Sequence, residues 1–155
     1  MKTKTIRVIL AFASLAITSA SITSALTFAN AQRSSGENPL NGTSWQLVRF
    51  QAPDERVITP DDKSKYTITF GSNGRVTARV DCNRASSTWK ATGNNQLQFG
   101  SWSRTSAKCG PGSLHDQIVM EGGAVRKFEI KDGHLFLSGM AAGGYYELEP
   151  LPRKR

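Results

Sequence analysis

Large apolar and polar side chains alternate along several short stretches of this chain, a pattern typical of β-strands buried on one face. Residues 66–70 alternate strictly, and residues 75–80 follow a turn at 71–74 whose Asn-Gly pair tolerates the positive φ angles of tight hairpins. Turn residues also occupy 93–95 and 131–133. The same pattern predicts strands at 45–50, 87–91, 96–99, 125–130, 134–137 and 145–149, with a less regular edge strand within 102–109.

One segment after these strands has the pattern of a short helix. Ser113 can cap free backbone amides, Asp116 follows three residues later, and Leu114 and Ile118 would share one face. A strand at 118–120 is the alternative. The chain is therefore predicted to be mainly β: a small antiparallel curled sheet or cracked β-barrel of about eight strands with one short helix.

The first thirty-one residues have the composition of an export signal. A basic start is followed by an apolar stretch at 8–17 and by the small-x-small site Ala29-Asn30-Ala31. A spanning helix needs about 20 mostly apolar residues, so an uncleaved membrane anchor is the less favoured alternative. We expect cleavage near Ala31, a periplasmic or secreted mature chain starting at Gln32, and no transmembrane segment in that mature chain.

The remaining sequence predicts a single domain. A polar, flexible lead-in at 32–41 would precede one β-domain at 42–150, and a basic tail at 151–155 would follow it. A long surface loop is expected at 51–65, where two prolines stand among polar and acidic residues. Because 124 residues remain after cleavage, the core should be modest in size.

Net charge does not indicate a nucleic-acid partner. The formal charge is +8, but the signal and the tail carry three positive charges each, which leaves +2 on residues 32–152. We therefore expect no nucleic-acid binding, while contact of the tail with an anionic membrane surface stays open. A monomer is expected.

Cys82 and Cys109 are the only cysteines. Two cysteines in an exported chain most simply form one disulfide, and free buried thiols or a reactive or metal-binding site are the alternatives. A zinc site needs about four ligands, and neither His115 nor His134 lies at a ligand spacing from a cysteine. We expect a disulfide, no metal and no cofactor.

Three residues near the cysteines are candidates for recognition. Asn83 and Arg84 follow Cys82 in a predicted turn, where their polar side chains could bind a partner. The alternative is that Asn83 makes a local turn bond and Arg84 faces water. Trp102 lies in an irregular segment and could be exposed, although aromatic residues of strands more often belong to the core.

The order of these motifs resembles the META/HslJ-like domain of bacterial exported proteins. The matching pieces are 42–47, 68–70, 74–76, 82–84, 97–100, Thr105 with Cys109, and 135–137. Two positions depart from the family pattern, because Asp81 stands where the family usually has Gly and Ala107-Lys108 where it usually has Met-Ala. The resemblance implies a small antiparallel β-fold with a packed helix, located in the periplasm or envelope. It also implies a link to stress or drug tolerance without an established activity, and a hydrophobic groove like that of related cracked barrels.

The function predicted from these features is non-enzymatic binding. The favoured interpretation is a binding or scaffold module that recognises an envelope protein through a sheet edge or aromatic patch. The alternative is a carrier of an apolar small molecule or acyl chain in a barrel groove. A weaker alternative is a hydrolase using His115, although adjacent residues such as His115 and Asp116 point about 100° apart on a helix.

Overall fold

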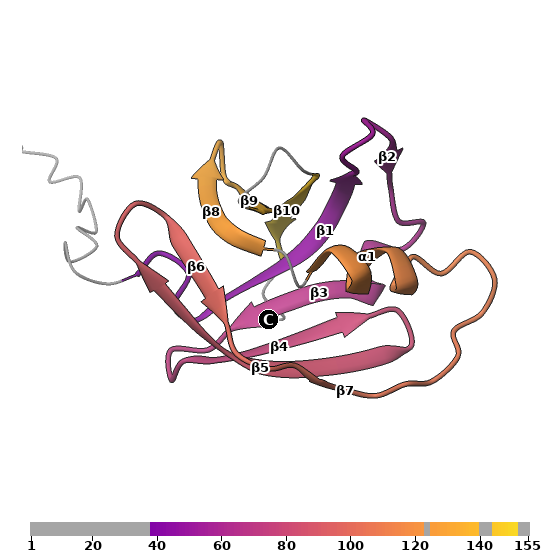
Figure 1. Cartoon of the computed structure of the whole chain (residues 1–155), viewed down its shortest axis with the longest axis horizontal. Helices are drawn as coiled ribbons and strands as arrows, with labels where there is room; N and C mark the ends of the chain where they lie inside the picture. Colours follow the sequence, from indigo (N-terminus) through magenta and orange to yellow (C-terminus); the bar gives the residue numbers. More distant parts are fainter. Residues whose placement is uncertain (1–37, 123–124, 140–143, 152–155) are drawn as a thin grey trace, which may run out of the picture. The chain divides into compact units, whose positions relative to one another are not determined.

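The computed structural model of the chain describes residues 38–122, 125–139 and 144–151 (Figure 1). The predicted signal peptide, most of the predicted lead-in and the end of the basic tail lie outside these residues. The described strands are β1 (Thr43–Gln51), β2 (Val57–Ile58), β3 (Tyr66–Phe70), β4 (Arg75–Val80), β5 (Asn83–Thr92), β6 (Gln96–Phe99), β7 (Ser103–Arg104), β8 (Val125–Lys131), β9 (His134–Gly139) and β10 (Tyr145–Pro150). A 3-10 turn spans Lys63–Lys65, and helix α1 spans His115–Gly122.

Eight of these strands form a closed antiparallel barrel. Their order around the barrel is β10-β9-β8-β6-β5-β4-β3-β1, and β1 also pairs with β10 to complete the ring. The short strands β2 and β7 add to β1 and β5. The predicted mainly β fold of about eight antiparallel strands with one helix is therefore confirmed, and of the two predicted forms, a curled sheet or a barrel, the structure has a closed barrel.

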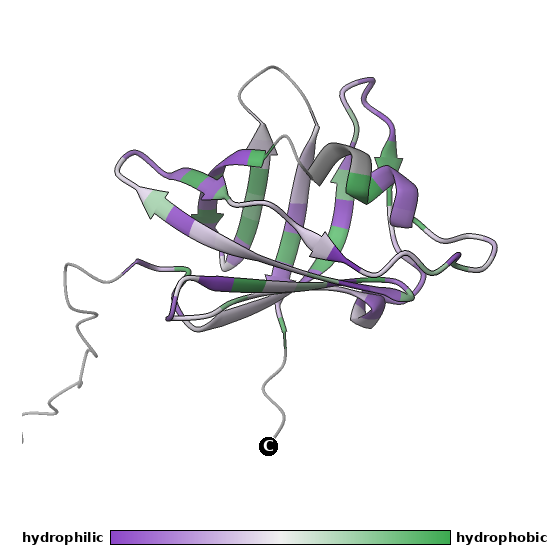
Figure 2. Ribbon diagram, turned by 60° about the horizontal axis from the view of Figure 1, so that its bottom comes forward, coloured by the Kyte–Doolittle hydropathy of each residue, from purple (hydrophilic) through white to green (hydrophobic). Residues whose placement is uncertain are grey.

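Alternation along each strand sends one set of side chains inward. On β9, Leu135 and Leu137 are buried, and on β10 Tyr146 and Leu148 are buried opposite them. Figure 2 shows the resulting green and purple bands along the strands. The buried apolar core comprises Leu40, Trp45, Leu47, Phe50, Ala52, Tyr66, Phe70, Val76, Trp89, Leu97, Val125, Phe128, Leu135, Leu137, Tyr146 and Leu148.

Two of the predicted hairpins form with the expected turn chemistry. Asp132 and Gly133 both have positive φ, at 51° and 80°, as a two-residue turn between β8 and β9 requires. Between β3 and β4, Gly74 has φ 75°, and the backbone N–H of Gly71 bonds the carbonyl of Arg75 at 2.7 Å. Strands 66–70 and 75–80 coincide with the predicted ranges.

One pair of neighbouring barrel strands, β6 and β8, is joined over a short length, which is called the narrow junction below. Strands β6 and β8 share a single register pair, Gln96 with Lys127, and the N–H of Phe128 bonds the carbonyl of Asn95 at 2.9 Å. By contrast, β1 and β10 pair over six positions. The chain leaves the barrel after β6, forms β7 and α1, and returns as β8, so the narrow junction lies where the sequence departs from hairpin order.

Several local expectations need correction. Asn83 and Arg84 do not form a turn but begin β5, because the reversal is made at Asp81, whose φ is 56°. Asp tolerates this left-handed conformation, which explains how it replaces the usual Gly. The expected loop at 51–65 contains β2 and the 3-10 turn, and the edge strand within 102–109 is only two residues long.

Helix α1 is present, so the alternative strand at 118–120 is wrong. Near the start of the described residues, Leu40 is fully buried although it lies in the predicted lead-in. A turn fixes it there, because its N–H bonds Oδ1 of Asn38 at 3.0 Å.

Candidate functional site

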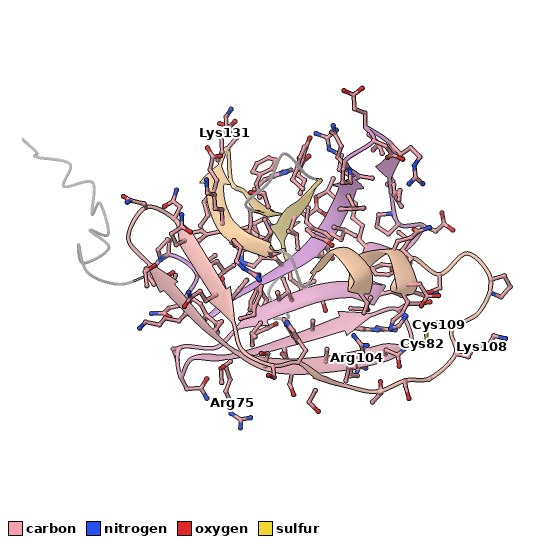
Figure 3. All side chains as sticks on the ribbon, viewed as in Figure 1. Arg75, Cys82, Arg104, Lys108, Cys109 and Lys131 are labelled. Carbon is pink, nitrogen blue, oxygen red and sulfur yellow. A yellow bond between two sulfur atoms is a disulfide. The ribbon has the colours of Figure 1, made fainter. Side chains whose placement is uncertain are left out.

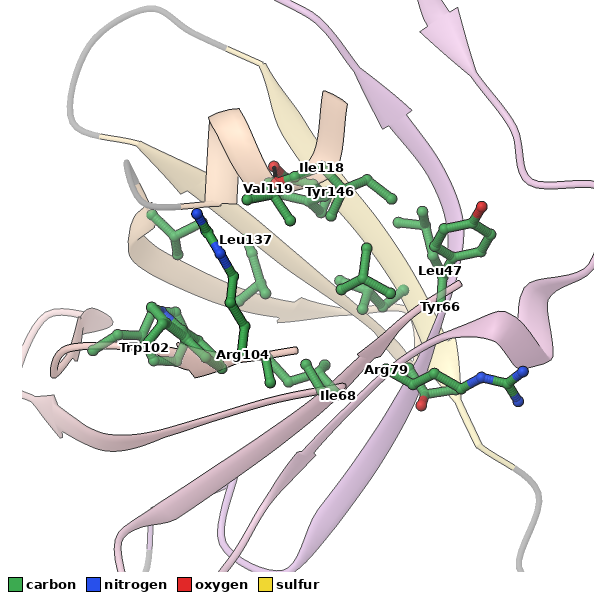
Figure 4. A pocket seen from close by; sticks show the side chains of 17 residues that line it. Leu47, Tyr66, Ile68, Arg79, Trp102, Arg104, Ile118, Val119, Leu137 and Tyr146 are labelled. Atoms are coloured by element: carbon green, nitrogen blue, oxygen red, sulfur yellow. Dashed lines mark hydrogen bonds between the residues drawn. The ribbon is translucent and has the colours of Figure 1, made fainter. Parts of the chain in front are cut away.

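An open-sided cavity of about 210 Å³ lies in the barrel beneath α1 (Figure 4). Apolar side chains from the barrel strands and the helix form most of its wall. The lining residues are Leu47, Tyr66, Thr67, Ile68, Ala78, Arg79, Val80, Ala85, Phe99, Trp102, Arg104, Ile118, Val119, Val125, Leu137, Tyr146 and Leu148.

Small side chains account for the empty space on one side of the cavity. Ala78 of β4 and Ala85 of β5 are register partners, and Ile68 of β3 pairs with Ala78. Register partners present their side chains to the same face of the sheet. Two neighbouring methyl groups therefore stand where larger residues would fill the interior, which leaves the volume beneath the helix unoccupied by side chains.

Helix α1 covers the cavity and is fastened by two tyrosines. Ile118 and Val119 contribute to the wall from the helix. The backbone N–H of Leu114 donates to the hydroxyl of Tyr66 at 3.0 Å, and the hydroxyl of Tyr146 donates to the carbonyl of Ile118 at 3.2 Å. Leu114 directly precedes α1, so the segment that begins the helix is attached to β3 and the helix itself to β10. Each bond joins a strand of the barrel to the segment that covers the cavity.

The predicted helix cap is present in a shortened form. The Ser113 hydroxyl accepts the backbone N–H of His115 at 3.1 Å, which satisfies one free amide at the start of α1. Leu114 and Ile118 both pack against the core, so the face predicted from their spacing is the buried one.

Trp102 belongs to the wall of the cavity. It is half-buried and lies against Phe99, with ring centroids 5.2 Å apart. Phe99 in turn stacks on the fully buried Phe70 at 6.3 Å. The predicted recognition residue thus connects the cavity to the aromatic core.

The two arginines of the cavity wall differ in their hydrogen bonds and in their positions. The guanidinium of Arg79 donates to the carbonyls of Asp81 at 3.0 Å and Ser64 at 3.4 Å. Arg104 of β7 is exposed and pairs in register with Ala85, so its side chain lies on the cavity face of the sheet. Figure 4 shows it rising from β7 towards α1.

The predicted disulfide between Cys82 and Cys109 is present, with Cα atoms 5.6 Å apart. It joins the start of β5 to the loop after β7, and Figure 3 shows both cysteines near Lys108. Cys82 is exposed and Cys109 is half-buried. The bond fixes the loop that leads from β7 to α1.

Asn83 reinforces the same connection and is only 2 % exposed. Its Oδ1 accepts the Thr105 hydroxyl and the Ala107 N–H, each at 2.8 Å, and its Nδ2 donates to the Ala107 carbonyl at 2.8 Å. The polar atoms of Asn83 are therefore used within the chain. Arg84 is exposed on the outer face of β5, and its part in recognition stays a prediction.

The two histidines lie at different places. His115 Nδ1 lies 2.8 Å from Oδ1 of Asp116, so these neighbours do form a pair, contrary to the argument from helix geometry. The pair stands at the helix start, and the Asp116 side chain is 95 % exposed. Within the described ranges, no serine or cysteine side chain bonds the His115 ring, and no group of three metal-binding side chains gathers.

Charged pairs hold the outer face of the β1–β10 closure. Glu147 accepts from Nε of Arg49 at 2.6 Å and lies 2.8 Å from Nδ1 of His134. The hydrogen bond from Arg49 is the main cause that lowers the pKa of Glu147, against the opposing effect of burial. Glu149 accepts from Gln46 at 2.7 Å, and this bond lowers its pKa in the same way.

A sequence pattern could have indicated part of this site. Ala78 and Ala85 are short residues at inward positions of neighbouring predicted strands, but pairing them requires the register of β4 and β5. Arg104 had no such signal, because its inward position depends on a two-residue strand within an irregular segment.

Comparison with known proteins supports the fold. The family model of the META domain matches residues 38–149. An NMR structure of a protein from Burkholderia xenovorans is similar at TM-score 0.59 and 19 % identity, over 74 % of this chain and 85 % of that one. A crystal structure of a DUF4847 family protein from Bacteroides vulgatus is similar at TM-score 0.57 and 16 % identity, over 75 % of this chain and 97 % of that one. No curated protein matches the chain. Among the described residues, every helix is too short or too polar to span a bilayer.

Proposed function

This chain belongs to the META domain family, and we propose that it is a non-catalytic carrier that binds a small apolar molecule inside its barrel. The observation that carries this proposal is the cavity beneath α1, whose wall is mostly apolar. Of the interpretations that the sequence allows, the carrier is the one that makes direct use of this space.

The size of the cavity limits the ligand. A dry engineered cavity of about 150 Å³ binds benzene or xenon, whereas pockets for drug-sized ligands start near 300 Å³. At about 210 Å³, this cavity suits a compact ring or a short hydrocarbon chain. Burial of about seven methylene groups at roughly 0.8 kcal/mol each would support binding in the millimolar to micromolar range.

The cavity is open on one side, and wider access to it would involve the helix. The attachments of α1 to Tyr66 and Tyr146 are two single hydrogen bonds, each with a net contribution of about 1 kcal/mol. Lifting the helix requires breaking these bonds and exposing the apolar contacts of Ile118. Helix α1 would thus act as a lid over the bound molecule.

The partner-binding interpretation has less support from the geometry. It depended in part on an exposed aromatic patch, and Trp102 instead packs against Phe99 in the cavity wall. We therefore treat recognition of an envelope protein as secondary to ligand binding.

Titration with octan-1-ol, followed by amide chemical shifts, tests the carrier. We expect saturable shifts at residues of the cavity wall and a raised melting temperature. Ala78→Leu should abolish both effects by filling the cavity. Thr77→Leu is the matched control, because Thr77 is exposed on the opposite face of the same strand. Absence of binding to the wild type, or equal binding by the Ala78→Leu variant, would overturn the proposal.

We further propose that the carrier works outside the cytoplasm after removal of the predicted signal peptide. The disulfide and the family are consistent with an extracytoplasmic location. The intact mass of protein recovered from periplasm or medium should correspond to a chain that begins at Gln32. Recovery of only full-length protein from membranes would contradict export.

A further inference from the structure

We propose that the ligand of this cavity is an anionic amphiphile, a medium-chain carboxylate whose acid group binds Arg104 and whose hydrocarbon tail fills the cavity. This inference rests on the proposed function, because it names the chemical class that the same cavity would take.

The position of Arg104 is unusual for a charged residue. Along β7, side chains alternate between the two faces of the sheet, and Ser103 pairs with the outward-facing Ser86. Arg104 pairs with Ala85, which lines the cavity, and Arg104 lines it too. Its guanidinium thus stands at the rim of an apolar space, on the side covered by α1 (Figure 4).

Arg104 has hydrogen-bonding capacity that the described residues do not use. Among the described residues, no carboxylate lies within ion-pair distance of Arg104, and the Arg104 side chain forms no hydrogen bond. The other arginine of the wall, Arg79, is occupied by two backbone carbonyls. Asp116 lies in the same concave surface as Arg104, but its carboxylate pairs with His115.

The cavity wall contains no acidic side chain among its described residues. An anion at the rim would therefore meet the positive charge of Arg104, whereas Arg79 is the register partner of the outward-facing Arg84 and presents its side chain on the other face of the sheet. Guanidinium presents parallel N–H groups that match a carboxylate in a two-bond pair. The adjoining wall is apolar, so a hydrocarbon tail continues from the acid group into the cavity.

The volume sets the length of the tail. One water has a share of about 30 Å³ in the liquid, and a methylene group is of similar size. The cavity of about 210 Å³ therefore accommodates roughly seven carbons. Octanoate fits this description, since it has seven carbons beyond its carboxylate.

A structural role for Arg104 predicts a different result. Inward-pointing charges on short edge strands hinder strand addition by other chains, and β7 pairs only with β5 among the described strands. Such a role would make Arg104 important for solubility and irrelevant to ligand choice. Binding measurements distinguish the two.

The experiment compares octanoate with octan-1-ol, which has the same chain length and no charge, by calorimetric titration at neutral pH. We expect the wild type to prefer octanoate. Arg104→Gln should weaken octanoate binding roughly tenfold to a hundredfold, the effect of losing hydrogen bonds to a charged group, and leave octan-1-ol within about twofold. Arg84→Gln is the matched control, because it removes the same charge from an exposed position outside the cavity wall.

Each outcome has a separate meaning. Equal affinity of the wild type for the two ligands, or an equal effect of Arg104→Gln on both, would overturn the anionic ligand while leaving the carrier intact. Equal weakening of octanoate by the two arginine variants would also overturn it, since net charge alone would explain the loss. Binding of neither ligand would overturn the carrier itself.

Discussion

Removing the Cys82–Cys109 disulfide should lower stability without changing the native structure. The exposed position of Cys82 allows a reductant to reach the bond in the folded protein. After reduction, Asn83 still holds the loop through three hydrogen bonds of 2.8 Å. The main effect is therefore expected in the unfolded chain, which gains freedom when the crosslink is lost.

The magnitude follows from the length of the closed loop. The cysteines are 27 positions apart, and the chain-entropy relation for a loop of that length gives a loss of about 3.5 kcal/mol in the free energy of unfolding. This is a large share of the 5–15 kcal/mol typical of a domain. For a domain of this size, the melting temperature should fall by roughly 10–20 °C.

Thermal unfolding with and without dithiothreitol measures this effect, and amide spectra recorded under both conditions report on the native state. The double variant Cys82→Ser/Cys109→Ser should match the reduced wild type and show no response to reductant. A melting temperature that changes by less than about 2 °C on reduction would refute the loop argument. Loss of the native spectrum on reduction would show that Asn83 cannot hold the loop alone.

Three further perturbations test particular contacts. Asn83→Ala should lower the free energy of unfolding by roughly 2–3 kcal/mol, since three hydrogen bonds are lost, and an unchanged urea midpoint would contradict this. The bond from Arg49 lowers the pKa of Glu147, so its stabilisation is present above the ordinary value of 4.5 and is lost as pH falls through the lowered pKa. The Glu147→Gln variant should therefore lose less stability on acidification than the wild type. Urea midpoints that depend on pH in the same way in both proteins would contradict a role for Glu147. Tyr66→Phe and Tyr146→Phe should each speed hydrogen exchange in α1, and exchange at the wild-type rate would show that their hydroxyls do not fasten the helix.

Local chemistry made much of the barrel predictable. Strict alternation at 66–70 and 75–80, with glycine in the connecting turn, determined β3 and β4, and the Asp132-Gly133 pair indicated the β8–β9 hairpin. These elements depend on side chains a few residues apart. Their local preferences agree with the final fold.

Elements that depend on distant contacts were harder to predict. Asn83 resembles a turn residue, yet it begins a strand because its amide finds Thr105 and Ala107 more than twenty positions away. The burial of Leu40 likewise requires the completed barrel. The family resemblance implied a hydrophobic groove, but its place and lining could not be predicted, because they arise from the pairing of Ala78 with Ala85 and from the placement of α1 above them.

Closure of the barrel by its first and last strands has a consequence for how the chain folds. Strand β1 cannot pair with β10 until nearly the whole domain is available, since Trp45 and Pro150 are register partners. Such long-range pairing raises contact order and slows folding. Until β10 arrives, the edge of β1 opposite β3 stays unpaired and can accept a strand from another molecule. A shortened chain that lacks β10 should therefore aggregate rather than form a smaller barrel. The barrel closes only when this final six-residue strand has paired with β1.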